Sequence, residues 1–187
     1  MKRFPLMLLL PVFAGSALAD DAPWVAEARQ VATSVPPKLL AMLSAEIAKG
    51  GPASAIEVCK DQAPRLAQQA SADTGWSIRR VSLRNRNPKA VPDAWERAAL
   101  EEFDQRAAAG ANPASLEKAE LVAEDGKPTM RYIKALPTQE LCLACHGPAE
   151  KLAPEVTAKL RALYPDDRAV GYAPGEIRGA MTIKKSQ

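Results

Sequence analysis

Apolar residues recur every three or four positions along the first part of the chain, and this spacing predicts helix. Between Trp24 and Ile47 the recurring residues are Val25, Ala28, Val31, Ala32, Val35, Leu39, Met42 and Leu43. The pair Pro36-Pro37 must kink this helix or start a second segment, and Gly50-Gly51 ends it. Pro52 opens another helix, 52–71, in which Cys59 shares the apolar face and therefore points inward.

Shorter segments with mixed periodicity follow. β-branched and aromatic content and rough alternation predict strands at 76–83, 118–124, 129–136 and 177–185. Asp125-Gly126 predicts a hairpin between the second and third of these strands. Helices are predicted at 94–109, where Asp93 and Glu96 can form a capping box, and at 149–163. The order of elements predicts an α+β fold with a small antiparallel sheet.

The first residues have the pattern of a secretory signal peptide. Lys2 and Arg3 precede a short apolar run, and Ala17-Leu18-Ala19 forms a small-residue cleavage site. We therefore expect residues 1–19 to be removed on export to the periplasm and residues 20–187 to form a single domain. No other stretch is long enough to cross a bilayer.

The composition changes this picture little. The chain is 47% hydrophobic and 25% charged, which is typical of a soluble globular protein. Loss of Lys2 and Arg3 lowers the formal net charge from +3 to +1. The mature chain is thus nearly neutral and has no basic tract, so its charge gives no reason to propose nucleic acid or an acidic membrane as a partner.

The strongest chemical signal is "QELCLACHGPAE", residues 139–150. Cys142, Cys145 and His146 form Cys-x-x-Cys-His, the attachment pattern of c-type haem. In this pattern the two thiols bind the porphyrin vinyl groups covalently, and the histidine becomes an axial ligand of the iron. Maturation of c-type haem takes place outside the cytoplasm, which agrees with the predicted signal peptide.

Three other uses of these cysteines are weaker. A thioredoxin-like Cys-x-x-Cys requires a βαβ setting, which the predicted hairpin does not supply. A structural zinc ion requires four Cys or His ligands, and the chain has only four such residues, Cys59 included. A disulfide between Cys142 and Cys145 would leave the adjacent His146 without a role.

The sequence alone leaves the second axial ligand open. His146 is the only histidine, so the second axial position of the iron would be occupied by Met, Cys, Lys or water, or would stay open. The candidate methionines of the mature chain are Met42, Met130 and Met181. By periodicity Cys59 is a buried, inert thiol, whereas as a thiolate ligand it would lower the redox potential.

The blocks "AIEVCKDQAP", "GWSIRRVSLRNRNPKAVPDAWE", "CLACHG" and "YPDDRAVGYAPGEIRGAM" resemble a family of exported monohaem c-type proteins with a PAS-like fold. The resemblance extends from about Ala55 to Met181. In that family the haem domain occurs alone or as the sensing part of histidine kinases. The resemblance implies one covalent haem on Cys142 and Cys145, with His146 and Cys59 as axial ligands.

Arginines provide candidate partners for the haem propionates, because guanidinium groups pair with carboxylates through two hydrogen bonds. The candidates are Arg80, Arg84 and Arg86, with Arg80 preferred over Arg79 because it shares a strand face with Trp76 and Ile78. The alternative is a solvated strand end and loop. Tyr164 and Tyr172 can contribute a hydrogen bond near the haem or fill the core.

Three functions are compatible with these residues. The first is a redox or small-gas sensor, in which Cys59 leaves the iron on reduction and NO or CO binds in its place, with a separate signalling protein as partner. The second is a soluble low-potential electron carrier. The third, an enzyme such as a peroxidase, ranks last, because Glu57 or Asp61 would have to act as the acid or base.

Overall fold

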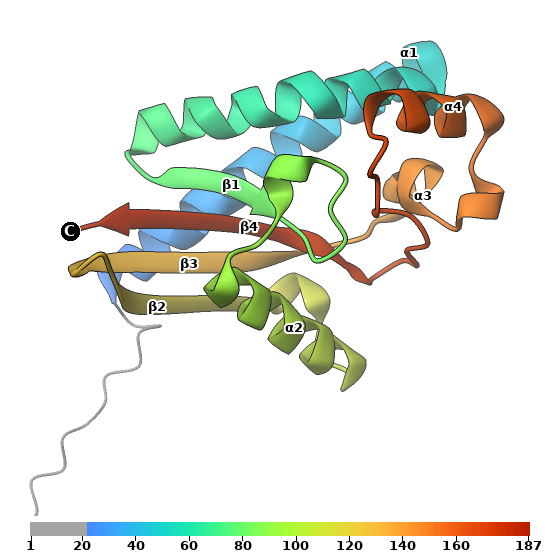
Figure 1. The fold of residues 1–187 in the computed structure, drawn as a ribbon. Coiled ribbons are helices and arrows are strands. Elements are labelled where there is room, and N and C mark those ends of the chain that lie inside the picture. Colours follow the sequence, from blue (N-terminus) through green and yellow to red (C-terminus); the bar gives the residue numbers. More distant parts are fainter. Residues whose placement is uncertain (1–21) are drawn as a thin grey trace, which may run out of the picture.

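The structure is a computed structural model and describes residues 22–187, so the predicted signal peptide, residues 1–19, lies outside the described residues. Its architecture is α+β, with a four-stranded antiparallel sheet between two helical layers (Figure 1). This agrees with the PAS-like α+β fold that the sequence predicts. Within the described part of the chain, no helix is both long and apolar enough to cross a membrane.

The N-terminal helix α1 (Pro23–Thr74) turns back on itself at Gly51. Gly51 has φ 77° and ψ 178°, a conformation that is essentially restricted to glycine. Figure 1 shows the two arms of α1 running in opposite senses on the same side of the sheet. The predicted break at Gly50-Gly51 is therefore confirmed. Pro36 and Pro37 lie inside the first arm with helical dihedral angles, so no second segment starts there.

The sheet has the strand order β1-β4-β3-β2. Its strands are β1 (Ser77–Val81), β2 (Glu117–Glu124), β3 (Lys127–Pro137) and β4 (Ile177–Ser186). The four predicted strands are confirmed within a few residues. The predicted hairpin is also confirmed, because Asp125 and Gly126 join β2 to β3 with φ values of 51° and 76°.

The two faces of the sheet are covered by different helices. On one face Trp76, Ile78 and Tyr132 pack against the first arm of α1. On the other face Ile133 and Ala180 pack against α2 (Ala94–Ala108). The predicted capping box starts α2: Asp93 accepts from the Glu96 amide, and Glu96 accepts from the Asp93 amide. Alternate residues of the strands therefore face two separate cores.

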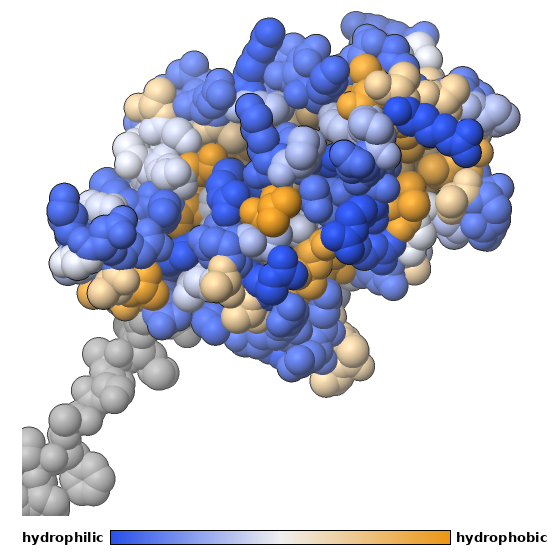
Figure 2. All heavy atoms as spheres, in the orientation of Figure 1, coloured by the Kyte–Doolittle hydropathy of each residue, from blue (hydrophilic) through white to orange (hydrophobic). Residues whose placement is uncertain are grey.

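A third core lies at one end of the sheet, beside the bend of α1. It joins Ile56 of α1 to Val156 and Leu160 of α4 (Pro154–Leu163), with Cys145 packed against it. Helix α3 (Glu140–His146) and the short 3-10 turn Ala149–Lys151 complete this end. Figure 2 shows apolar side chains gathered over the region of α3 and α4, on a surface that is otherwise mainly hydrophilic.

The predicted helix 149–163 is wrong at its start. Residues Ala149–Lys151 form a separate 3-10 turn, and α4 begins only at Pro154. The reason is local: the proline ring disfavours helical dihedral angles at the preceding residue, and Ala153 is accordingly extended, with φ −60° and ψ 144°.

Candidate haem site

The cysteine motif lies on α3, a helix of seven residues directly after β3. Cys142, Cys145 and His146 are all half-buried, and both cysteines are free thiols. Gly147 ends the helix where the chain passes close to its own backbone, since a Cβ at Gly147 would lie 2.6 Å from the Leu143 carbonyl oxygen. The motif therefore sits on a short rigid turn with the glycine that this turn requires.

His146 is held in one orientation by the loop that follows α4. Its Nδ1 atom lies 2.7 Å from the carbonyl oxygen of Ala169. A carbonyl oxygen has no proton to give, so this contact requires the proton on Nδ1. Asp167 fixes the acceptor by accepting, through Oδ1, from the Ala169 amide at 2.8 Å. In a neutral ring the lone pair is then left on Nε2, the state that an iron-binding histidine needs.

The charge environment keeps this imidazole neutral. Burial, followed by the positive charges of Arg178 and Arg86, holds the pKa of His146 well below its usual value. Arg178 Nε also lies 3.1 Å from His146 Nδ1, a contact that would need the opposite tautomer to be a hydrogen bond. The carbonyl contact is the shorter of the two, and it favours the proton on Nδ1.

Cys59 reaches the same region from the second arm of α1. Burial raises the pKa of the Cys59 thiol, and the charges of Arg80, Arg86 and Arg178 oppose this rise by favouring the thiolate. The Cys142 thiol also acts on it electrostatically. Cys59 therefore shares the electrostatic environment of three guanidinium groups and of the motif thiol Cys142.

Cys145 is enclosed where the second arm of α1 begins. Its Sγ atom lies 3.7 Å from the carbonyl oxygen of Pro52, and its side chain packs against the third core. Burial raises the pKa of the Cys145 thiol to about 11, although Arg86 favours its thiolate. The attachment motif and the helix of Cys59 are thus in direct contact.

The three candidate arginines have different surroundings. Arg84 lies over the Tyr172 ring, 3.9 Å from its centroid, and donates to the Val170 carbonyl oxygen. Arg86 is buried and donates to Asp167 Oδ2 at 3.0 Å and to the Cys145 carbonyl oxygen at 2.6 Å. Arg80 alone of the three has no hydrogen-bond or ion-pair partner among residues 22–187. Burial lowers its pKa, and the thiols of Cys59 and Cys142 act against this.

Arg178 of β4 is a site residue that the sequence did not single out. It is 6% exposed, and its Nη1 donates to Ser82 Oγ at 3.1 Å and to the Arg84 carbonyl oxygen at 3.2 Å. Burial and the charge of Arg80 lower the pKa of Arg178 to about 9. Arg80, Arg86 and Arg178 give this region three positive groups, and the one carboxylate that pairs with them in the described chain is Asp167.

The remaining candidates lie in or around the cores. Tyr164 packs in the third core, and burial raises its pKa to about 12. Tyr172 is buried beside His146, with an edge-on ring contact of 6.4 Å between centroids. Glu57 and Asp61 are exposed, and Glu57 pairs with Lys159.

The methionines are built into the core or lie near the surface. Met130 and Met181 are buried in the core between the sheet and α1, while Met42 is 36% exposed. Within residues 22–187 there is no group of three or more His, Cys, Asp or Glu side chains that could hold a bare metal ion. The donor set fits a haem, whose porphyrin supplies the other four iron ligands: two free thiols, a neutral histidine and unpaired positive charge.

The family model that matches this chain spans residues 19–186 and is described as Tll0287-like. The chain belongs to the Tll0287-like family. A solved structure described as the cyanobacterial heme-protein Tll0287 matches with a TM-score of 0.67 and 24% identity. The match covers 89% of this chain and 97% of that one, so the fold of the Tll0287-like family accounts for nearly the whole molecule. No curated protein matches.

Proposed function

We propose that this chain is an exported c-type haem protein that binds one haem through Cys142 and Cys145, with His146 and Cys59 as the axial ligands of the iron. Membership of the Tll0287-like family and the description of its solved relative as a heme-protein support haem binding. The Cys-x-x-Cys-His motif on α3 supports covalent attachment. The signal-like residues 1–19 support maturation in the periplasm.

The observation that carries the proposal is the state of His146. Its Nδ1 proton is engaged by Ala169 at 2.7 Å, and its surroundings keep the ring neutral. An iron-ligating histidine commonly donates its other ring N–H to a backbone carbonyl in this way, which fixes the ring and raises its basicity. A histidine that merely filled the core would not need a cysteine pair in its own helix.

Cys59 is proposed as the second ligand because of the arginines around it. Burial raises the pKa of Cys59, and the charges of Arg80, Arg86 and Arg178 partly offset this by favouring the thiolate form that binds iron. Bound haem would supply an iron that changes its charge by one electron and two propionates that carry negative charge. Arg80, which has no partner among the described residues, is the first candidate for a propionate, whereas Arg84 and Arg86 already donate to other groups.

The proposed role is redox or small-gas sensing. Cys59 belongs to a helix that contacts α3, α4 and β1, so a change in its ligation would alter the packing of several elements. A soft thiolate that leaves the iron on reduction would open a position for NO or CO. Iron that keeps both ligands in each oxidation state would favour the alternative, a low-potential electron carrier.

The test is spectroscopy of the protein matured with haem in a bacterial periplasm. We expect a haem that stays with the polypeptide on a denaturing gel, and a low-spin ferric thiolate signal in electron paramagnetic resonance. Cys59→Ser should abolish the thiolate signal but retain covalent haem, whereas C142A/C145A should lose covalent haem. Met181→Leu is the control, because Met181 lies in the core between the sheet and α1.

The outcomes separate the parts of the proposal. A thiolate signal that survives C59S would remove Cys59 from the ligand set. A signal that M181L changes would instead point to methionine ligation. Dithionite reduction followed by addition of CO then distinguishes a sensor, which should form a CO complex, from a carrier whose spectrum CO leaves unchanged.

A further inference from the structure

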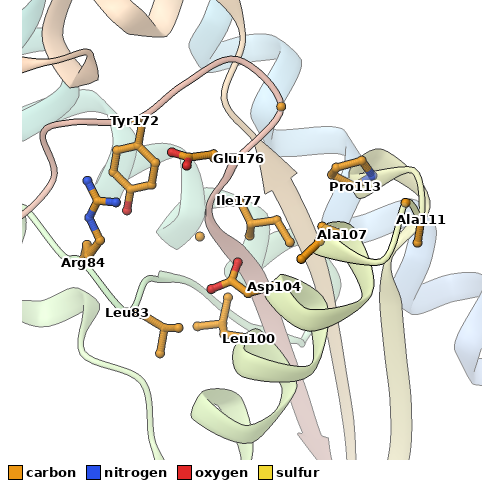
Figure 3. Close-up of a pocket in the computed structure, with 14 residues that line it drawn as sticks. Leu83, Arg84, Leu100, Asp104, Ala107, Ala111, Pro113, Tyr172, Glu176 and Ile177 are labelled. Carbon is orange, nitrogen blue, oxygen red and sulfur yellow. The ribbon is translucent and has the colours of Figure 1, made fainter.

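A hollow lies on the α2 side of the sheet. It is a cavity of about 530 Å³ formed by α2, by the turn that follows α2 and by the segment that leads into β4. Figure 3 shows Asp104 of α2 and Glu176 of that segment around one space, with Tyr172 and Arg84 at its edge. A cavity of this size is in the range of small-molecule sites.

The polar groups of the cavity favour positive charge. The Asp104 carboxylate has no hydrogen-bond or ion-pair partner in the described chain, and the Glu176 carboxylate accepts only from the Ala173 amide, at 2.9 Å. Both side chains are exposed at the opening of the cavity. Partial burial and the charge of Glu176 raise the pKa of Asp104, and the charge of Arg84 opposes this rise. Arg84, the cation nearest to them, is held against Tyr172 and the Val170 carbonyl oxygen.

The C-terminal end of α2 also favours positive charge in the cavity. Helix α2 ends at Ala108, and Ala107, Ala108 and Gly110 line the cavity. The C-terminal end of a helix carries partial negative charge and stabilises cations. The last turn of α2 therefore adds a small contribution to the field of the two carboxylates, although the carbonyl groups of Gln105, Arg106 and Ala107 already accept backbone hydrogen bonds.

The rest of the lining indicates an organic cation and not a metal ion. Leu83, Leu100 and Ile177 present apolar surface to the same space, as Figure 3 shows. A metal site would need at least a third ligand, and residues 22–187 contain no group of three or more suitable side chains. An ammonium group with an apolar body matches both parts of the lining.

We propose that this cavity binds a small organic amine in its cationic form, with the ammonium group at Asp104 and Glu176 and the apolar body against Leu83, Leu100 and Ile177. This site is separate from the proposed haem site but shares a wall with it. Tyr172 lines the cavity, and its amide donates to the His146 carbonyl oxygen at 2.9 Å. Tyr172 would thus contact both the bound amine and the motif histidine.

The test is a nuclear magnetic resonance titration of the ¹⁵N-labelled full-length mature holoprotein. The probes are n-butylamine, cyclohexylamine and 2-phenylethylamine, each paired with the alcohol of the same shape. Ligands of this size are expected to bind with a Kd on the order of 1 mM. We expect saturable shifts for amides of α2 and residues 172–179 with at least one amine, and at least tenfold weaker binding of its alcohol.

Substitutions locate the ammonium group. Asp104→Asn and Glu176→Gln should each weaken amine binding about tenfold. Ala108→Leu should fill the cavity with a larger side chain, and because Ala108 is exposed the substitution should leave the core unchanged. Glu101→Gln is the matched control for the loss of one nearby negative charge, because Glu101 is exposed on the same helix and acts electrostatically on Asp104 but does not line the cavity. The visible spectrum is recorded in parallel to detect any amine that binds the iron instead.

Three results would overturn the proposal. They are the absence of saturable binding for all three amines, equal binding of amines and alcohols, and amine binding that D104N and E176Q leave unchanged. Stronger shifts with CaCl₂ than with the amines, lost in D104N, would assign the cavity to a metal ion and also reject the amine. The haem proposal is tested by a different experiment, the loss of covalent haem in C142A/C145A. If no amine binds, the proposed haem function is therefore unaffected.

Discussion

His146 Nδ1 and the Ala169 carbonyl oxygen lie 2.7 Å apart, which ties the motif helix to the loop between α4 and β4. We expect the haem-free protein to hold its single histidine as the Nδ1–H tautomer. The ¹⁵N chemical shifts of the ring measure this directly, and the signal needs no assignment because the chain has one histidine. A proton found on Nε2 would instead make Arg178 the donor to Nδ1. It would contradict the prediction that the Nε2 lone pair is free to bind iron.

A second prediction concerns the pair that fixes this loop. Arg86 and Asp167 form a buried ion pair, with side chains 8% and 11% exposed. Asp167→Asn leaves Arg86 as an uncompensated buried charge and should lower the free energy of unfolding by about 3 kcal/mol. Urea denaturation measures this loss. The control is Asp166→Asn at the exposed neighbouring position, and equal losses for the two variants would contradict the structural role of the pair.

A third prediction concerns acid stability. Glu117 accepts from Arg29 Nε at 2.7 Å, Tyr132 Oη at 2.8 Å and Lys134 Nζ at 3.1 Å. These donors outweigh the effect of burial and lower the pKa of Glu117 from 4.5 to about 2. A lowered pKa contributes stability that is complete above the unfolded value, so it should be lost as pH falls from about 4.5 to about 2.

Glu117→Gln tests that contribution. After allowance for the partial exposure of the side chain, we expect this variant to lose about 2 kcal/mol at pH 7 and to show a flatter pH dependence between pH 5 and pH 2. Urea denaturation across this pH range is the measurement. Glu101→Gln, on the exposed face of α2, should keep the wild-type profile. A wild-type slope in E117Q would assign the acid sensitivity to other carboxyl groups.

A fourth prediction concerns the bend in α1. Gly51 adopts a conformation that a Cβ makes costly, so Gly51→Ala should destabilise the protein by about 1–3 kcal/mol. It should also weaken the low-spin ferric thiolate signal of the haem-loaded protein, because the bend returns Cys59 to the region of the motif helix. Gly50→Ala has no positive φ to strain and would meet mainly the flexible Ser54 side chain, so its loss should be smaller. Calorimetry and electron paramagnetic resonance measure the two effects.

Local patterns in the sequence predicted most of the fold. Gly51, the Asp93–Glu96 box and Asp125-Gly126 each act within a few residues, so sequence was sufficient to find them. Pro36-Pro37 was ambiguous, because packing of the first arm on the sheet keeps the helix continuous there. The periodicity of 149–163 predicts too early a start for α4, because it takes no account of the effect of Pro154 on Ala153.

The candidate site was only partly predictable. The motif identified Cys142, Cys145 and His146. Arg178 and Ala169, which contact His146, lie in the block "YPDDRAVGYAPGEIRGAM", but no chemical pattern within that block singles them out. The sequence of β4 offers a weak signal, because Arg178 is the one charged residue in the stretch 177–183. Nothing local distinguished the partnered Arg86 from the unpartnered Arg80, because the partner of Arg86, Asp167, is 81 residues away.

The contact between Cys145 and Pro52 joins residues 93 positions apart, with β1, α2, β2 and β3 between them in the chain. The region where the motif helix meets the second arm of α1 therefore forms only after the intervening chain has folded. Its formation carries the entropic cost of closing that loop. Binding of haem by both the motif and Cys59 would therefore indicate that the whole chain has folded. A truncated or misfolded chain would keep the motif, yet it could not bring Cys59 to it.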